Sequence, residues 1–243
     1  MSSVPRASAS VRGCAWKNFP YEGDERMSSR LPRWVLTLVV VALAAAAVLA
    51  VSSVRDPLLR AAGWALVVSD PVAPADLIVV SLDSGAAAAL EAADLVQNGI
   101  ATRVAVFADP PHGEDLEFIR RGVAYEDTAA RQTRHLRWLG VKDVVQIPRT
   151  DIEAEGEVES LPQWCAQHQV RSIVFVAIRE KSRRLQRELN RAMKGHQTRV
   201  MVQPSRYSSF DPDRWWKTRG GIRTELMELQ RLAFELVLHP MSF

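Results

Sequence analysis

The stretch that decides the fold is Asp76-Leu-Ile-Val-Val-Ser-Leu-Asp-Ser-Gly85. Its apolar part, Leu77–Val80, is rich in β-branched residues and lies between Pro74 and a Ser/Asp/Gly turn. Such a run is typical of a strand that is buried on both faces inside a parallel sheet. An alanine-rich helical pattern over 86–96 follows at once. The stretch therefore predicts the opening of a βαβ unit, and ligands of open α/β sheets bind beyond the carboxyl ends of the strands.

The same alternation of apolar runs and helical patterns continues along the chain. Strands are expected at 76–81, 103–108, 143–147, 172–178 and 198–202. Helices are expected at 86–96, 116–121, 127–139, 157–169 and 179–193. Strands alternating with helices predict one doubly wound α/β domain over 76–243, with a mostly parallel sheet covered by helices on both faces.

The last part of the chain predicts a long helix. Asp211-Pro212 has the residues of a helix start, with Asp as the N-cap and Pro at the first position. Apolar residues then recur at helical spacing: Ile222, Leu226, Leu229, Ala233 and Leu236. We expect this stripe to pack on the sheet.

Residues 34–54 form an uncharged apolar run. It has the length of a transmembrane helix, which needs about 20 residues. The alternative is a cleaved signal peptide, since Val48-Leu49-Ala50 would suit a cleavage site, but the run is longer than the usual apolar region of such a peptide. We favour a retained signal-anchor, with residues 55–75 as the linker to the domain.

The distribution of charge predicts the orientation of the anchor. Residues 1–33 carry six basic and three acidic side chains, whereas residues 55–243 carry 25 of each. The positive-inside rule then places a cytoplasmic, disordered tail before the anchor, starting at Met1 or Met27, and the domain outside the cytoplasmic membrane. The excess of +3 for the whole chain comes from this tail, so the domain has no basic surplus for nucleic acid.

Two stretches are candidates for a ligand site. Asp83-Ser84-Gly85 follows the central strand, where backbone N–H groups and a helix N-terminus can face an anion, although a plain turn capped by Ser84 explains it equally well. Lys181 and Arg184 begin the helix after the strand at 172–178, where cations oppose the helix dipole unless a ligand supplies negative charge. The alternative is a solvated basic face, shared by Arg183, Arg184, Arg187, Arg191 and Lys194.

The sequence has no further motif that indicates a cofactor, a metal ion or a catalytic nucleophile. The acidic run at 151–159 could share a proton or bind a cation, but a solvated loop is the favoured interpretation. The chain has no GxGxxG, no P-loop and no Gly-x-Ser-x-Gly motif, so no cofactor is identified. No histidine pair has metal-ligand spacing, and Cys14 and Cys165 would lie on opposite sides of the membrane without a disulfide.

The order of these features resembles the YdcF-like family of bacterial envelope proteins, which includes SanA and ElyC. The resemblance begins with the N-terminal anchor. The matching segments that follow it in order are Val67-Val-Ser-Asp-Pro71, Ala75-Asp-Leu-Ile-Val-Val80, Asn98-Gly-Ile-Ala101, Leu139-Gly-Val141, Arg183-Arg184, Trp215-Trp216 and Glu225 or Glu228. The resemblance implies a Rossmann-like three-layer sandwich and a part in envelope biogenesis. It implies no settled reaction.

The chain departs from the family pattern where chemistry is expected. Residues 81–85 replace a glycine-rich turn, and alanines at 86–89 replace an arginine. Ala177-Ile178 and Lys181 stand where a Thr-Ser pair and a histidine are usual, while Arg184 matches the family arginine. We therefore expect an anchored domain that binds a small anionic ligand through Asp83, Ser84, Gly85, Lys181 and Arg184. The alternatives are a catalytically silent scaffold, or a hydrolase or transferase acting on a phosphate- or glycan-bearing envelope precursor.

Overall fold

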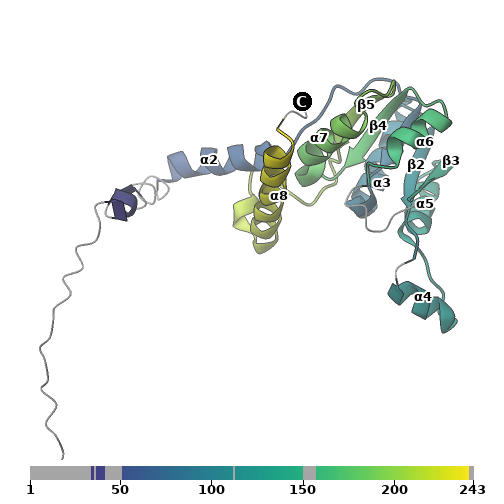
Figure 1. Cartoon of the computed structure of the whole chain (residues 1–243), viewed down its shortest axis with the longest axis horizontal. Helices are drawn as coiled ribbons and strands as arrows, with labels where there is room; N and C mark the ends of the chain where they lie inside the picture. Colours follow the sequence, from purple (N-terminus) through teal and green to yellow (C-terminus); the bar gives the residue numbers. More distant parts are fainter. Residues whose placement is uncertain (1–33, 36, 42–50, 112, 150–156, 241–243) are drawn as a thin grey trace, which may run out of the picture. The chain divides into compact units, whose positions relative to one another are not determined.

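The computed structural model describes residues 34–35, 37–41, 51–111, 113–149 and 157–240 (Figure 1). The chain divides into two compact units, Met1–Ala47 and Val48–Phe243. In the first, residues 34–35 and 37–41 are helical. Everything below concerns the second unit.

A parallel sheet of five strands forms the centre of this unit. The strands are β1 Leu77–Val80, β2 Arg103–Ala108, β3 Asp143–Pro148, β4 Ser172–Ala177 and β5 Arg199–Pro204. Their order is β3-β2-β1-β4-β5, and every neighbouring pair is parallel. This confirms the five predicted strands and their parallel arrangement.

Alternate residues of β1 face two different helical layers, which explains why the whole strand is apolar. Leu77 and Val79 pack with α6, Leu161–Gln167, and α7, Ser182–Ala192, on one face of the sheet. Ile78 and Val80 pack with the helices of the other face, α3 Gly85–Gln97 and α5 Thr128–Trp138. All four residues of β1 are fully buried. The fold is thus a Rossmann-like α/β sandwich with helices on both faces.

Two helices between β2 and β3 begin or end where local sequence signals predict. Asp127 caps α5 as predicted, because its side chain accepts a hydrogen bond from the Ala130 N–H at 2.5 Å. Helix α4, Gly113–Arg120, ends before Gly122, whose positive φ of 74° favours glycine. Helix α4 buries none of its residues.

Two predicted helices start later than expected. The helix expected from residue 157 begins at Leu161, because residues 157–160 form turns that carry Glu157 to the end of β1. The helix expected from residue 179 begins with a short 3₁₀ segment, η2 Arg179–Lys181, before α7.

Residues 55–75, expected to be a linker, belong instead to the fold. Helix α2, Ser52–Ala65, contains the first part of this segment. Beyond it, the Asp70 N–H donates to the Val202 carbonyl at 2.9 Å, and the Val202 N–H donates to the Asp70 carboxylate at 2.8 Å. Arg183 donates to the carbonyls of Ala65 and Val67. These contacts bind the segment to β5 and α7, so the domain begins before residue 76.

The final helix also begins later than predicted. Asp211 does not cap a helix; its carboxylate accepts from the Asp213 N–H within a turn, at 2.9 Å. A 3₁₀ segment, η3 Trp215–Lys217, follows, and α8 occupies Arg219–Leu238. The N-cap is Thr218, whose hydroxyl accepts from the Gly221 N–H at 3.0 Å.

The expected buried stripe of α8 is wrong as well. Ile222, Leu226 and Leu236 are exposed, whereas Glu225, Glu228 and Leu232 are buried. The reason is that α8 packs on α7, which presents arginines to it, and on α2, rather than on the sheet. Carboxylates that pair with these arginines face inward beside Leu229 and Leu232, and most of the expected stripe faces outward.

Among the described residues, no helix is both long and apolar enough to cross a membrane. Residues 42–50 of the expected anchor, and the tail over 1–33, lie outside the described part of the chain.

Candidate functional site

The candidate site lies at the carboxyl edge of the sheet, next to β1 and β4. The strand order reverses between these neighbours, since β1 continues through β2 to β3 and β4 continues to β5. In open α/β folds this reversal leaves a crevice that binds ligands. The turn after β1 and the η2 segment after β4 meet there.

The structure brings together two of the predicted residues. The Lys181 ammonium lies 2.9 Å from the Asp83 carboxylate, although the two residues are 98 positions apart in the chain. The Lys181 side chain is largely buried, and that of Asp83 is exposed. The carboxylate of the pair therefore faces solvent, while the ammonium lies inside the crevice.

Arg184 lies beside this pair but is already engaged. Its guanidinium is 2.5 Å from Glu188 and 3.4 Å from Glu228, and its side chain is largely buried. Burial acts to lower the pKa of Arg184, but the two carboxylates outweigh it and raise the pKa. Arg184 thus belongs to a network of ion pairs between α7 and α8.

Ser84 and Gly85 support the turn but do not line the cavity. The Ser84 side chain does not cap α3, and its buried hydroxyl has no hydrogen-bond partner among the described residues. Gly85 has a φ of 54°, a backbone conformation that favours glycine. Of the five predicted residues, Asp83, Lys181 and Arg184 therefore line the cavity, and Ser84 and Gly85 do not.

The sequence did not identify Glu157, whose side chain lies at the carboxyl end of β1. Its carboxylate accepts a hydrogen bond from the Ser81 hydroxyl at 2.7 Å and a second from the Leu82 N–H. Burial raises the pKa of Glu157 to about 7, against the opposing effect of these two hydrogen bonds. The favoured interpretation of the acidic run as a solvated loop is therefore wrong for this residue, while 151–156 lie outside the described residues.

These groups enclose a cavity of about 180 Å³. It is lined by three basic side chains, three acidic side chains and two leucines: Arg149, Lys181, Arg184, Asp83, Glu157, Glu188, Leu82 and Leu185. Glu157, whose carboxyl has a pKa raised to about 7, shares this cavity with Lys181 and Asp83, the two charges that act on it. The charge balance of the cavity therefore changes when Glu157 gains or loses a proton.

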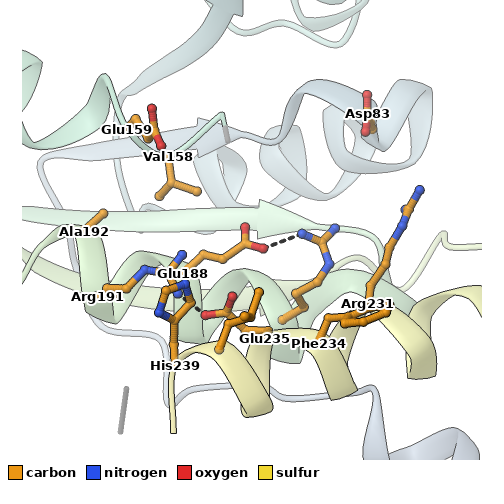
Figure 2. Close-up of a pocket in the computed structure, with 12 residues that line it drawn as sticks. Asp83, Val158, Glu159, Glu188, Arg191, Ala192, Arg231, Phe234, Glu235 and His239 are labelled. Carbon is orange, nitrogen blue, oxygen red and sulfur yellow. Dashed lines mark hydrogen bonds and ion pairs between the residues drawn. The ribbon is translucent and has the colours of Figure 1, made fainter. Parts of the chain in front are cut away.

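A larger cleft of about 880 Å³ shares Asp83, Arg184 and Glu188 with this cavity. Figure 2 shows this cleft, in which Arg191 of α7 pairs with Glu235 of α8. Arg231 also lines it, 2.7 Å from Glu228. The cleft thus lies over the junction of α7 and α8.

Of the five cations on the basic side of α7, Arg191 and Lys194 are exposed, as a solvated face requires, whereas Arg183, Arg184 and Arg187 are engaged by other parts of the chain. Arg184 and Arg191 pair with glutamates of α8, and Arg187 donates to the His239 carbonyl at 2.9 Å. Arg183 binds the segment after α2. The basic run mainly connects α7 with α8 and with the segment after α2.

No cluster of three or more His, Cys, Asp or Glu side chains suited to a metal ion occurs in the part of the chain that the structure describes.

The comparisons with known proteins identify no relative in sequence. No family model matches the chain, and no curated protein sequence matches it. Two solved structures are similar in part. One is the universal stress protein from Archaeoglobus fulgidus in complex with dAMP, at 11% identity and a TM-score of 0.34, covering 54% of this chain and 98% of that one. The other is the aureusimine biosynthetic cluster reductase domain, at 12% identity and a TM-score of 0.23, covering 60% of this chain and 37% of that one. At these TM-scores neither similarity carries an argument about function.

Proposed function

We propose that this chain is a membrane-anchored, YdcF-like protein of envelope biogenesis whose α/β domain lies outside the cytoplasmic membrane. In this proposal the domain binds a small anionic ligand in the cavity beside Asp83 and Lys181. The observation that carries the proposal is the ion pair of these two residues at the point where the strand order reverses.

The cavity suits an anion for a physical reason. The Lys181 side chain is held in a largely buried position by one exposed carboxylate, so a ligand carboxylate or phosphate can replace Asp83 at little cost. Arg149 and Arg184 line the same cavity; each is already paired, Arg149 with Asp109 at 2.7 Å and Arg184 with two glutamates, so Lys181 is the cation that the proposal relies on. A ligand oxygen can also accept a hydrogen bond from the Leu82 N–H, provided that the Glu157 carboxylate no longer accepts it.

A scaffold without a ligand is the second candidate, and one observation favours it. Within the described residues, Lys181 pairs with Asp83 and Arg184 with Glu188 and Glu228, so carboxylates of the chain already neutralise these cations. A hydrolase or transferase acting on a phosphate- or glycan-bearing precursor remains a third hypothesis. It would use Glu157 as the group that exchanges a proton.

Thermal-shift titration of the full chain in detergent separates the first two hypotheses. The probes are inorganic phosphate, a nucleotide and a sugar phosphate, tested on the wild type, Lys181→Gln and Lys194→Gln. Lys194 is an exposed cation just after α7 that does not line the cavity, so it is the matched control. We expect at least one probe to stabilise the wild type and Lys194→Gln, but not Lys181→Gln. If no probe stabilises the wild type, or all three proteins respond equally, the scaffold hypothesis leads.

Reporter fusions test the location of the domain. A reporter that works only in the periplasm, fused after Phe243, should be active, and one that works only in the cytoplasm should be inactive, because the basic excess precedes the apolar run. The reverse pattern would exclude the external location. A soluble mature protein starting near Val51 would instead identify the apolar run as a cleaved signal.

A further inference from the structure

The outward side of α8 is unusually apolar for a helix whose inner side is charged. Its exposed large apolar residues are Ile222, Leu226, Met227, Phe234, Leu236, Val237 and Leu238. Four of them leave more than half of their surface in solvent: Leu226 with 60%, Phe234 with 58%, Val237 with 77% and Leu238 with 68%. Most of these residues share one side of the helix at 3.6 residues per turn. We call this set the outer face of α8.

The acidic side chains of α8 lie on its inner side, and its exposed charged side chains are basic. Glu225 and Glu228 are buried, and the Glu235 side chain is largely buried against Arg191. The exposed charged residues of the helix are all basic: Arg219, Arg223 and Arg231. The outer face and its margins thus combine apolar side chains with arginines and carry no acidic side chain.

The ion pairs with α7 prevent the helix from rotating to bury its apolar residues. Such a rotation would break Arg184–Glu228 and Arg191–Glu235 and would leave charged groups buried without partners. The outer face therefore stays outward, and an exposed apolar patch of this kind marks an interaction surface.

The position of α8 in the fold suits a surface next to the membrane. Leu59 and Ala62 of α2 pack with Leu232 and Trp215, and the Trp215 indole N–H donates to the Leu59 carbonyl at 2.7 Å. The last three residues of the apolar run, 52–54, form the start of α2, which exposes Val54, Leu58 and Trp64. Helix α8 is thus held against the helix that leads from that run (Figure 1).

We propose that the outer face of α8 lies on an anionic lipid bilayer, with its apolar side chains at the boundary between headgroups and acyl chains. A helix with apolar residues and arginines, and no exposed acid, has the composition of an interfacial membrane helix. Arginines near an anionic lipid surface are attracted to it electrostatically. A two-fold contact with a second copy of this face is disfavoured, because it would bring the same arginines together without an acidic partner.

Nitroxide labels on the full chain test this directly. Each label is attached to a cysteine introduced by one substitution. The substitutions are Leu226→Cys and Phe234→Cys on the outer face, Arg137→Cys on the exposed side of α5, and Ala45→Cys in the apolar run. The background is Cys14→Ser, since Cys165 is buried and burial raises the pKa of its thiol to about 11, which makes it unreactive. The protein is placed in vesicles of phosphatidylglycerol and phosphatidylethanolamine, and accessibility to oxygen and to a water-soluble nickel complex is measured.

We expect the oxygen-to-nickel accessibility ratio at 226 and 234 to be several-fold higher than at 137, and to fall when phosphatidylcholine replaces the anionic lipid. Water-like values at both outer-face positions would overturn the inference, as would values that do not depend on the lipid charge. Spin–spin broadening between copies without lipid contact would also overturn it. The label at 45 reports the anchor separately, so failure of the anchor and failure of the α8 surface are distinguishable.

Discussion

The carboxylate of Glu157 accepts a hydrogen bond from the Ser81 hydroxyl, 2.7 Å away, at the carboxyl end of the central strand. The Leu82 N–H donates to the same carboxylate. A side chain of the protein thus occupies backbone and hydroxyl donors that a ligand anion would otherwise use. This relationship couples any anion binding at the cavity to the protonation of one residue.

The binding of sulfate to the wild type should therefore weaken between about pH 6 and pH 8. Ionised Glu157 places a negative charge in the cavity, and its pKa is raised to about 7 mainly by burial. Sulfate stays a dianion over this range, so the change reports the protein. We expect Glu157→Gln to remove the pH dependence and the exposed control Glu114→Gln to keep it, measured by calorimetric titration. Equal pH dependence in wild type and Glu157→Gln would show that another group is responsible.

Replacing Asp83→Asn should strengthen anion binding. Asp83 is the carboxylate that competes for Lys181, and its exposed position limits the pair to roughly 1 kcal/mol or less. The expected gain in sulfate affinity is thus up to about fivefold. Asp143→Asn is the control. It breaks the exposed pair with Arg103 at the amino ends of β2 and β3, and it should leave the sulfate affinity unchanged. Weaker binding by Asp83→Asn would mean that Asp83 contacts the ligand instead of competing with it.

Replacing Glu225→Gln should stabilise the protein at pH 8. Both carboxylate oxygens are buried without a hydrogen-bond partner among the described residues, and burial raises the pKa from 4.5 to about 7. The folded state then holds a proton that the unfolded state releases, so stability falls as the pH rises from 4.5 to about 7 and stays low above it. We expect a gain on the order of 1–3 kcal/mol at pH 8 that disappears near pH 4.5, from denaturant unfolding.

Glu228→Gln is the matched control on the same helix. Glu228 is also buried, but it pairs with Arg184 and Arg231. Its neutral variant should lower stability at pH 8, because it leaves a buried guanidinium with a weaker partner. If both variants change stability in the same direction, the unpartnered state of Glu225 is not what determines the effect.

Replacing Phe175→Asp should abolish the cooperative melting of the domain. Phe175 is fully buried on β4 and packs against Phe107, with ring centroids 6.3 Å apart. An unpaired charge in this layer costs several kcal/mol, a large part of a typical total stability of about 5–15 kcal/mol. Trp138→Asp on the exposed side of α5 should melt close to the wild type in differential scanning calorimetry. A native transition in Phe175→Asp would contradict the buried parallel sheet.

The secondary structure could be predicted wherever its signal is local. The run at Leu77–Val80 has apolar residues on both faces, which is typical of a strand buried between two helical layers. The cap at Asp127 likewise acts within its own turn. Even the meeting of Asp83 and Lys181 could be expected, because both follow neighbouring strands whose carboxyl ends share one edge of the sheet.

The direction of α8 and the place of Glu157 could not be predicted in the same way. An apolar stripe usually faces inward, but α7 presents Arg184 and Arg191, and their pairing with glutamates of α8 turns the apolar stripe outward. Glu157 reaches the end of β1 across 76 residues of chain, so no local pattern marks it. The sequence by itself determined the strands, the helices and the layers, because these depend on periodicity and caps. Only the tertiary structure decided which charges meet, because ion pairs and burial depend on neighbours that are distant in the chain.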